Sequence, residues 1–196
     1  MAVAEELVDT PMRASRLSRT ALAVIVVLAS GSTSMADAFT LRSFFAGRSV
    51  SVGEVRTLGL FSEQFTARFE GRSSGAVIDL DERFRFEDGE RLQRWHLEER
   101  GGRVSGTVRT EDGDGRLQGP FPVSGTSGPQ GAVLTYRGIA PGGGRFALDF
   151  RHEMSPRAGG TVANRVRVSR FGLPLARARV TFSKSTEALE PHVSDP

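Results

Sequence analysis

The chain has 196 residues and no cysteine, and its 26 Lys and Arg against 23 Asp and Glu give a formal net charge of +3. The absence of cysteine excludes disulfides, thiolate chemistry, cysteine-ligated metals and the lipid-attached cysteine of an exported lipoprotein. The basic residues are scattered among acidic ones and form no dense run. This distribution indicates a general preference for arginine rather than a nucleic-acid site.

Residues 12–38 have the pattern of a secretory signal peptide. Arginines precede an apolar run at residues 20–30, and the small residues from Ala36 to Ala38 supply a cleavage site. The run is about half of the roughly 20 residues that span a membrane, so we expect a signal peptide rather than an anchor. The pattern predicts a periplasmic or secreted protein, for which nucleic acid is not an expected partner.

The chain divides into three predicted parts. Residues 1–38 hold the signal peptide, with Met12 as the expected start because the residues before it are acidic ahead of a basic region. Residues 39–184 form the folded domain. Residues 185–196 are polar and are predicted to be a disordered tail.

Apolar and polar residues alternate with a period of two through nearly all of the folded domain, which predicts β-strands. Phe44 and Phe45 come first and indicate a short turn or 3₁₀ plug. Strands are expected near residues 52–58, 64–71, 75–86, 91–99, 103–110, 117–123, 132–138, 145–154, 161–171 and 175–184, the sixth of them irregular. No stretch predicts a helix longer than a turn or two.

These strands predict an all-β fold, an antiparallel β-barrel of about eight to ten strands. A closed barrel is favoured over a sandwich because closure removes exposed strand edges. A barrel of about eight strands can hold one small ligand.

Several short motifs together resemble a known bacterial family. They are FF-x-G from Phe44 to Gly47, L-x-E-x-F-x-F-x-D-G from Leu80 to Gly89, Trp95, Asn164, and R-F-G from Arg170 to Gly172. The set resembles the uncharacterised DUF3833 family, whose members are often exported lipoproteins, over residues 41–184. The resemblance implies a lipocalin-like barrel and no established activity. The chain departs from the family in lacking the lipidated cysteine, which favours a soluble periplasmic form.

Charged and aromatic residues are densest at residues 80–97, where Asp88-Gly89 is a strong signal for a two-residue hairpin turn. This turn pairs Glu82 with Trp95. The inward face then holds Leu80, Glu82, Phe84, Phe86, Arg91, Gln93, Trp95 and Leu97. The outward face holds Asp81, Arg83, Arg85, Arg94 and His96, so most of the charge is expected to meet water.

Glu82 is the exception, because it lies on the apolar face. A buried carboxylate is protonated or paired, since an unpaired charge inside a protein costs several kcal/mol. Three roles fit Glu82: a polar link to Gln93 or Arg91, a group that orients a ligand, or a catalytic acid. His152 and Asn164 also fall on apolar faces, where they can satisfy each other or contact a ligand.

Known enzyme and metal motifs do not occur in the sequence. There is no H-E-x-x-H metal spacing, no G-x-S-x-G nucleophile elbow and no complete phosphate loop. Residues 111–115, EDGDG, resemble a calcium loop only loosely and are expected to form an acidic turn. We therefore predict no catalytic residue, no metal and no cofactor.

The first functional hypothesis is a barrel that binds an apolar or amphipathic ligand such as a fatty acid or lipid. The residues expected to line its site are Phe65, Phe69, Glu82, Phe84, Arg91, Gln93, Trp95, Tyr136, Phe150, His152 and Asn164. The second is an accessory envelope protein with a filled barrel, whose arginine-rich outer face binds a partner or an anionic membrane surface. The third is an enzyme for a lipid or isoprenoid-like substrate, with Glu82 or His152 as acid or base. An open interior supports the first hypothesis and a filled one supports the second.

Overall fold

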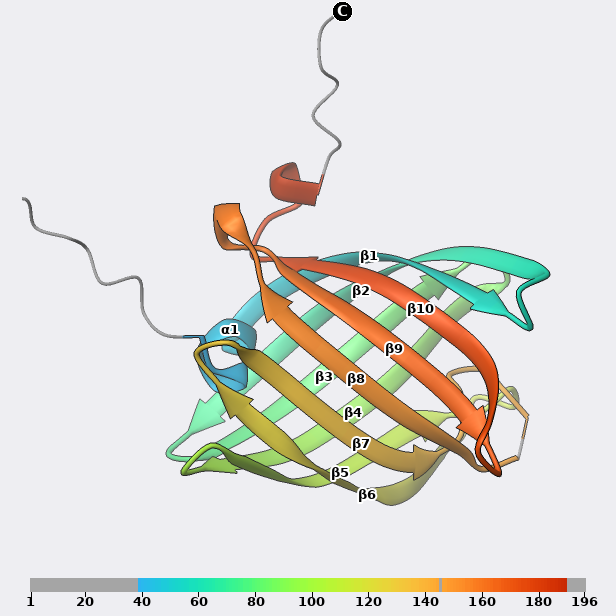
Figure 1. The fold of residues 1–196 in the computed structure, drawn as a ribbon, viewed down its shortest axis with the longest axis horizontal. Coiled ribbons are helices and arrows are strands. Elements are labelled where there is room, and N and C mark those ends of the chain that lie inside the picture. Colours follow the sequence, from blue (N-terminus) through green and yellow to red (C-terminus); the bar gives the residue numbers. More distant parts are fainter. Residues whose placement is uncertain (1–38, 145, 190–196) are drawn as a thin grey trace, which may run out of the picture. The chain divides into compact units, whose positions relative to one another are not determined.

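The computed structural model describes residues 39–144 and 146–189, which fold into one closed antiparallel barrel (Figure 1). Ten strands follow one another around the barrel in chain order, and pairing of the first strand with the last closes it. The predicted all-β barrel of eight to ten strands is therefore confirmed. The predicted signal peptide at residues 1–38 lies outside the described residues.

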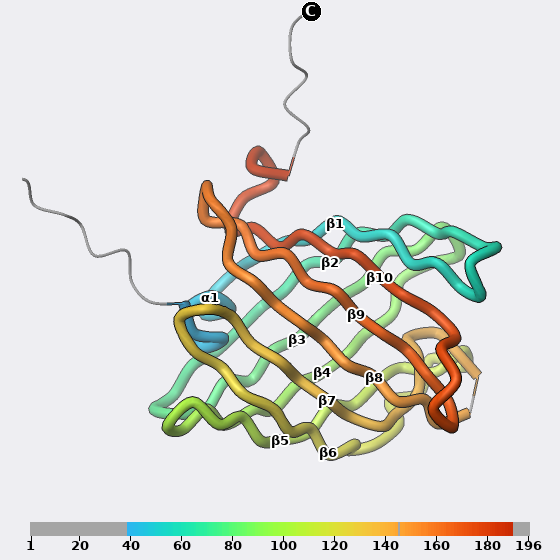
Figure 2. The backbone as a smooth tube through the Cα atoms, viewed as in Figure 1, coloured from blue at the N-terminus to red at the C-terminus, as the bar shows by residue number. Residues whose placement is uncertain are grey.

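Each strand pairs with the next along the chain, and the tilted strands are easiest to follow in the backbone trace (Figure 2). The elements are α1 (Leu41–Phe45), β1 (Gly47–Thr57), β2 (Phe61–Ser74), β3 (Val77–Phe86), β4 (Gly89–Arg100), β5 (Arg103–Glu111), β6 (Leu117–Gly128), β7 (Gly131–Gly138), β8 (Leu148–Pro156), η1 (Ala158–Gly160), β9 (Val162–Arg170), β10 (Leu173–Ser183) and η2 (Glu187–Leu189). The sixth strand is longer than predicted, because β6 continues five residues past residue 123.

The helix α1 packs into one end of the barrel and confirms the predicted plug, as a single α-helical turn. The ring centroid of Phe45 lies 5.4 Å from those of Phe69 and Phe182. At Gly71 of β2, a Cβ atom would lie 1.9 Å from the Phe45 carbonyl oxygen, so only glycine fits beneath the helix. Lys184 donates hydrogen bonds to two carbonyl oxygens at the end of α1, at 2.7 and 2.8 Å.

The opposite end of the barrel is formed by the turns β1–β2, β3–β4, β5–β6, β7–β8 and β9–β10, and is called the rim below. Because the strands are antiparallel and consecutive, α1 and the remaining turns all lie at the other end. Two rim turns hydrogen-bond to each other: the Gly142 N–H donates to the Glu111 carbonyl oxygen, and the Gly113 N–H donates to the Gly143 carbonyl oxygen.

The predicted register of the β3–β4 hairpin is wrong by two residues. The turn is Glu87–Asp88 rather than Asp88-Gly89, and Glu82 lies opposite Gln93 rather than Trp95. The glycine is needed one position later, because the first residue of β4 has a φ of 137°. A shift of two residues leaves every side chain on its predicted face. The inward and outward sets predicted for this hairpin are therefore correct.

The inward-facing side chains form one apolar cluster, because alternation points every second residue of each strand into the barrel. Past β10, residues 185–189 form a bend and the turn η2, and the rest of the predicted tail lies outside the described residues. Within the described part of the chain, no helix is long and apolar enough to cross a membrane.

Candidate functional site

Most of the predicted site residues meet inside the barrel, in the space called the lumen below. They come from β3, β4, β7, β8 and β9, whose alternation turns them inward. Each of these side chains is 8% exposed or less: Glu82, Phe84, Gln93, Trp95, Tyr136, Phe150 and Asn164. His152 is partly buried on the same inner face of β8.

Glu82 points inward beside Trp95, as predicted. The Trp95 Nε1–H donates to Glu82 Oε2 at 2.9 Å. Burial raises the pKa of the Glu82 carboxyl from 4.5 to about 8, although the bond from Trp95 acts in the opposite direction. Glu82 is therefore a neutral carboxylic acid at neutral pH, with a proton to donate to a neighbouring acceptor.

Aromatic rings from β4, β7 and β8 meet across the lumen. The Trp95 ring meets Tyr136 edge-on, with centroids 5.4 Å apart, and meets His152 at 5.9 Å. Tyr136 also stacks on Phe150, with centroids 4.6 Å apart. Burial raises the pKa of the Tyr136 phenol, so its hydroxyl stays protonated. These contacts bring β4 within reach of β8 across the interior.

His152 and Asn164 form a pair, which is the mutual satisfaction that the sequence allowed. Asn164 Nδ2 lies 3.3 Å from His152 Nδ1. Burial lowers the pKa of the His152 imidazole to about 4, so the ring is neutral at neutral pH. The remaining polar atoms of the pair, His152 Nε2 and Asn164 Oδ1, are buried without a hydrogen-bond partner.

Two serines of β1 add further buried polar atoms to the lumen, and sequence reasoning missed them. Ser49 and Ser51 are 1% and 2% exposed, and neither Oγ atom has a hydrogen-bond partner. Alternation in the stretch S-V-S-V would place the valines inward, whereas Val52 is 39% exposed and the serines are buried, so the sequence pattern indicated the opposite face. Gln93, by contrast, is satisfied, because its Nε2 donates to Thr110 Oγ1 at 2.8 Å.

Arg91 does not reach Glu82, so the predicted link between them is not formed. Its guanidinium donates to Asp88 Oδ2 at 2.9 Å and to the Glu90 carbonyl oxygen at 2.7 Å. The side chain also lies against the β7–β8 loop, where a Cβ on Gly142 would come within 2.3 Å of Arg91 Nε. Arg91 therefore packs between two rim turns, and its charge lies at the rim rather than in the lumen.

Phe84 belongs to a separate aromatic group nearer the rim. The ring centroids of Phe65, Phe84 and Phe86 lie 5.3 to 5.7 Å from one another. Gly53 of β1 makes room for them, since a Cβ there would lie 2.5 Å from the Phe65 ring. Partly buried apolar residues pack against the core at this end of the barrel, and the set is called the mouth below: Val55, Phe86, Phe121, Leu148 and Ala176.

Glu82 and His152 have different hydrogen-bond neighbours in the lumen. Glu82 is protonated and His152 is neutral, and each is held by a neighbour that is neither an acid nor a base. The acidic turn at residues 111–115 uses its buried carboxylate internally, because Asp112 Oδ1 accepts the backbone N–H groups of Asp114 and Arg116 at 2.9 Å. Among the described residues, no three His, Asp or Glu side chains are grouped to hold a metal ion.

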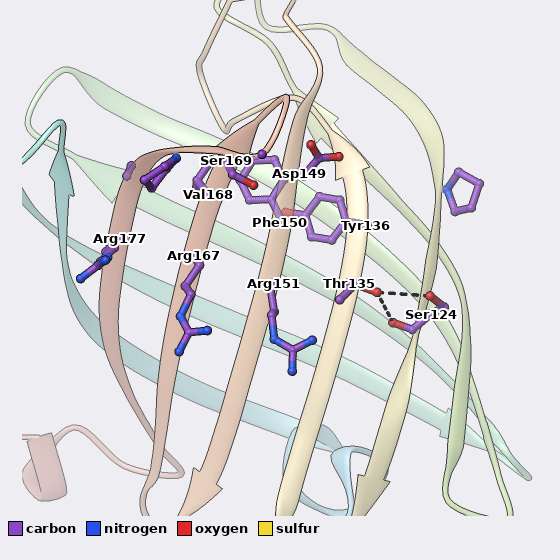
Figure 3. A pocket seen from close by; sticks show the side chains of 14 residues that line it. Ser124, Thr135, Tyr136, Asp149, Phe150, Arg151, Arg167, Val168, Ser169 and Arg177 are labelled. Carbon is purple, nitrogen blue, oxygen red and sulfur yellow. Dashed lines mark hydrogen bonds between the residues drawn. The ribbon is translucent and has the colours of Figure 1, made fainter.

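The outer wall holds a feature that sequence reasoning missed. A hollow of about 480 Å³ lies over β6 to β10, and Figure 3 shows Arg177, Arg167 and Arg151 side by side along it on three neighbouring strands. Their alignment depends on the pairing between strands, which no local sequence pattern shows.

Comparison with known proteins agrees with the motifs. No curated protein matches the chain. A model of the family described as "Protein of unknown function (DUF3833)" matches residues 27–184, which include every strand of the barrel. The chain therefore belongs to the DUF3833 family.

Proposed function

We propose that the lumen binds one small amphipathic molecule whose polar head is uncharged, such as a monoacylglycerol or a fatty acid in its protonated form. The observation that carries the proposal is the set of four buried polar atoms without partners: Ser49 Oγ, Ser51 Oγ, His152 Nε2 and Asn164 Oδ1. Buried polar atoms are almost always hydrogen-bonded, to protein, to ordered water or to a ligand. A ligand with hydroxyl or ester groups supplies the partners that they lack.

The protonation states of the lumen favour a neutral head. Glu82 and His152 are both uncharged near pH 7, and Arg91 is held at the rim. A carboxylate brought into this site would lose its hydration without gaining a counter-charge. A hydroxyl or ester loses less hydration energy on burial. A hydroxyl can donate to Asn164 Oδ1, and either group can accept a hydrogen bond from the protonated Glu82 carboxyl.

The apolar part of the ligand would lie among the aromatic residues between Trp95 and the mouth. Each buried CH₂ group contributes about 0.8 kcal/mol. A chain of about ten such groups thus supports a micromolar dissociation constant, after the cost of ordering the ligand. The signal-peptide pattern adds that this binding takes place outside the cytoplasm.

A second candidate function is a non-catalytic envelope protein with a filled barrel. The ring contacts favour it, because Trp95 reaches across the lumen to His152, and Phe65, Phe84 and Phe86 pack together below the mouth. A ligand enters only if this second group moves aside. The two functions therefore differ in a measurable way.

The test is a titration of residues 39–196 with monolaurin, followed by the fluorescence of Trp95, which is the chain's single tryptophan. We expect a saturable change with a micromolar dissociation constant, about tenfold weaker in Asn164→Leu. Gln64→Leu, which removes an exposed amide on β2, is the matched control and should bind like the wild type. At pH 7, where Glu82 is protonated, laurate should bind more weakly than monolaurin.

Two results would contradict the proposal. No saturable signal with monolaurin would leave the filled barrel as the function. Equal affinity for laurate and monolaurin at pH 7 would show that the site accepts a charged head.

A further inference from the structure

Three neighbouring turns of the rim expose large apolar side chains to solvent. Leu60 is 81% exposed, Phe171 76% and Phe61 70%, and the remaining members of the set are Leu58, Phe146 and Leu173. These residues belong to the β1–β2, β7–β8 and β9–β10 turns, which follow one another around the barrel because β1 pairs with β10 and β8 with β9 (Figure 1). Soluble proteins rarely expose apolar surface so densely without a binding role.

Two of these turns carry apolar residues where a polar residue would fit better. Leu58 and Phe171 each have a φ of 51°, and each is followed by a glycine that also has positive φ. Turns with two positive φ angles prefer asparagine or aspartate before glycine, because a bulky residue is strained there. The chain instead holds a leucine and a phenylalanine, both exposed, in this strained conformation. Such strain at an exposed position indicates a function for the side chain.

The acidic residues of the rim lie on the side opposite the apolar turns. The described residues of the three apolar turns, 57–61, 146–148 and 170–174, include no acidic side chain. The other two turns, β3–β4 and β5–β6, hold four carboxylates against one arginine, Arg116, and the carboxylates are Glu87, Asp88, Asp112 and Asp114. One side of the rim is thus apolar and free of acids, and the other side is acidic.

A row of arginines crosses the outer wall behind the apolar turns. Cross-strand pairing places Arg56 opposite Arg177, Arg177 opposite Arg167 and Arg167 opposite Arg151, and Figure 3 shows the last three pointing the same way. Within the described residues Arg177 makes no ion pair, and the others share two glutamates: Glu54 pairs with Arg56, and Glu153 with Arg151 and Arg167.

The next row away from the rim is also basic on balance. It runs Glu54, Arg179, Arg165 and Glu153. The two rows together hold six arginines and two glutamates, so the wall behind the apolar turns is strongly positive.

Arg170, beside the β9–β10 turn, brings positive charge and exposed apolar side chains together at the rim. Its guanidinium carbon lies 4.6 Å from the Phe146 ring centroid and 5.0 Å from that of Phe171. No ion pair of Arg170 occurs in the described part of the chain, and its buried Nε has no partner. A cation held between two exposed rings suits the boundary where lipid phosphates meet acyl chains.

We propose that this side of the rim docks on the surface of an anionic lipid bilayer. The spacing fits such a surface, because Phe171 lies four positions after Arg167, or roughly 10 Å along the barrel axis. Apolar groups at a membrane interface enter to a depth of about 5–10 Å. The arginine row then lies at the phosphates, and the acidic turns lie on the side away from them. The inference stands independently of a ligand in the lumen.

The test is flotation of the protein with vesicles of phosphatidylcholine and phosphatidylglycerol in a 3:1 ratio, compared with phosphatidylcholine alone. Wild-type protein should bind the anionic vesicles at least tenfold more tightly, and added salt should weaken that binding. The variant Leu58→Asn/Phe171→Asn should lose at least tenfold in affinity for both vesicles. Since asparagine suits positive φ, this variant should keep the wild-type thermal midpoint, which separates docking from folding.

The arginine row is tested by Arg167→Gln/Arg177→Gln. Each arginine near an anionic surface contributes about fivefold in affinity, so this variant should bind anionic vesicles roughly 25-fold more weakly. Arg83→Gln/Arg109→Gln removes the same charge from exposed positions on β3 and β5 and should change binding less than twofold.

The proposal is overturned if wild-type protein ignores the anionic vesicles, or if the two arginine variants lose equally. It is also overturned if the asparagine variant binds vesicles like the wild type. Concentration-dependent dimers that this variant abolishes, with no vesicle binding, would assign the apolar turns to self-association instead.

Discussion

Replacement of Glu82 by glutamine should change how the stability of the protein depends on pH. The wild-type carboxyl is protonated in the folded protein up to a pKa of about 8, whereas in the unfolded chain it ionises near 4.5. Between these values the folded state holds one more proton than the unfolded state, so the free energy of unfolding falls as pH rises. Glutamine keeps the acceptor for the Trp95 Nε1–H but has no proton to lose.

His152 acts in the opposite direction over a different range. Its pKa falls from 6.5 in the unfolded chain to about 4 in the barrel. The His152 imidazole therefore takes up a proton in the unfolded chain but not in the barrel, and the free energy of unfolding decreases as pH falls from 6.5 to 4. Where both groups titrate, between pH 4.5 and 6.5, the two slopes cancel and stability is flat.

Of Glu82 and His152, Glu82 is the group that titrates above pH 6.5, and the magnitude of its effect follows from its pKa. Each pH unit changes the free energy of unfolding by about 1.36 kcal/mol, so the wild type loses about 2 kcal/mol of stability from pH 6.5 to pH 8. The full range from 4.5 to 8 corresponds to about 5 kcal/mol for this group alone. With a urea m-value of about 2 kcal/mol per molar, the midpoint should fall by about 1 M between pH 6.5 and pH 8.

The assay is urea unfolding at closely spaced pH values, followed by Trp95 fluorescence. The Glu82→Gln midpoint should not fall above pH 6.5 and should decrease in acid, where His152 still acts. Glu63→Gln, an exposed carboxyl on β2, is the control and should follow the wild type. A wild-type midpoint that is constant from pH 6.5 to 8 would refute the reasoning, since Glu82 would then not be held as the neutral acid.

Two further predictions concern the helix that plugs the barrel. Gly71→Ala should destabilise the protein by more than about 2 kcal/mol, because its Cβ would overlap the Phe45 carbonyl oxygen. Gly128→Ala, where a Cβ meets nothing within 4 Å, should leave the urea midpoint nearly unchanged. Lys184→Met should cost about 1 kcal/mol through the lost hydrogen bonds to the end of α1, measured the same way, and Lys184→Arg should recover part of it.

The fold followed closely from alternation, because a period of two fixes both the strands and the face of each residue. The β3–β4 hairpin shows the limit of this reasoning. Asp88-Gly89 indicated the right hairpin with the wrong turn, because the glycine serves the strand and not the turn. The inward prediction for Glu82 survived, since an error of two residues preserves parity.

The candidate site was less predictable where contacts run between distant strands. Alternation placed Glu82 and His152 in the lumen, but the approach of Trp95 to His152 depends on how far the barrel closes across its interior. Arg91 has inward parity and yet serves the rim, because its long side chain reaches Asp88. The arginine row depends on the register of three separate strand pairs. Sequence periodicity predicts the face of each residue but not the register between strands.

The closing pair of strands decides how the protein can be handled on a surface. Because Val50 of β1 lies opposite Ser183 of β10, the described chain enters and leaves the barrel at the α1 end, far from the rim. A biosensor chip coupled directly ahead of residue 39 or directly after residue 189 would therefore hold the barrel with its rim toward the flowing sample. Monolaurin and anionic vesicles could then be passed in turn over one preparation, because the attachment would block neither ligand entry at the mouth nor vesicle docking on the rim.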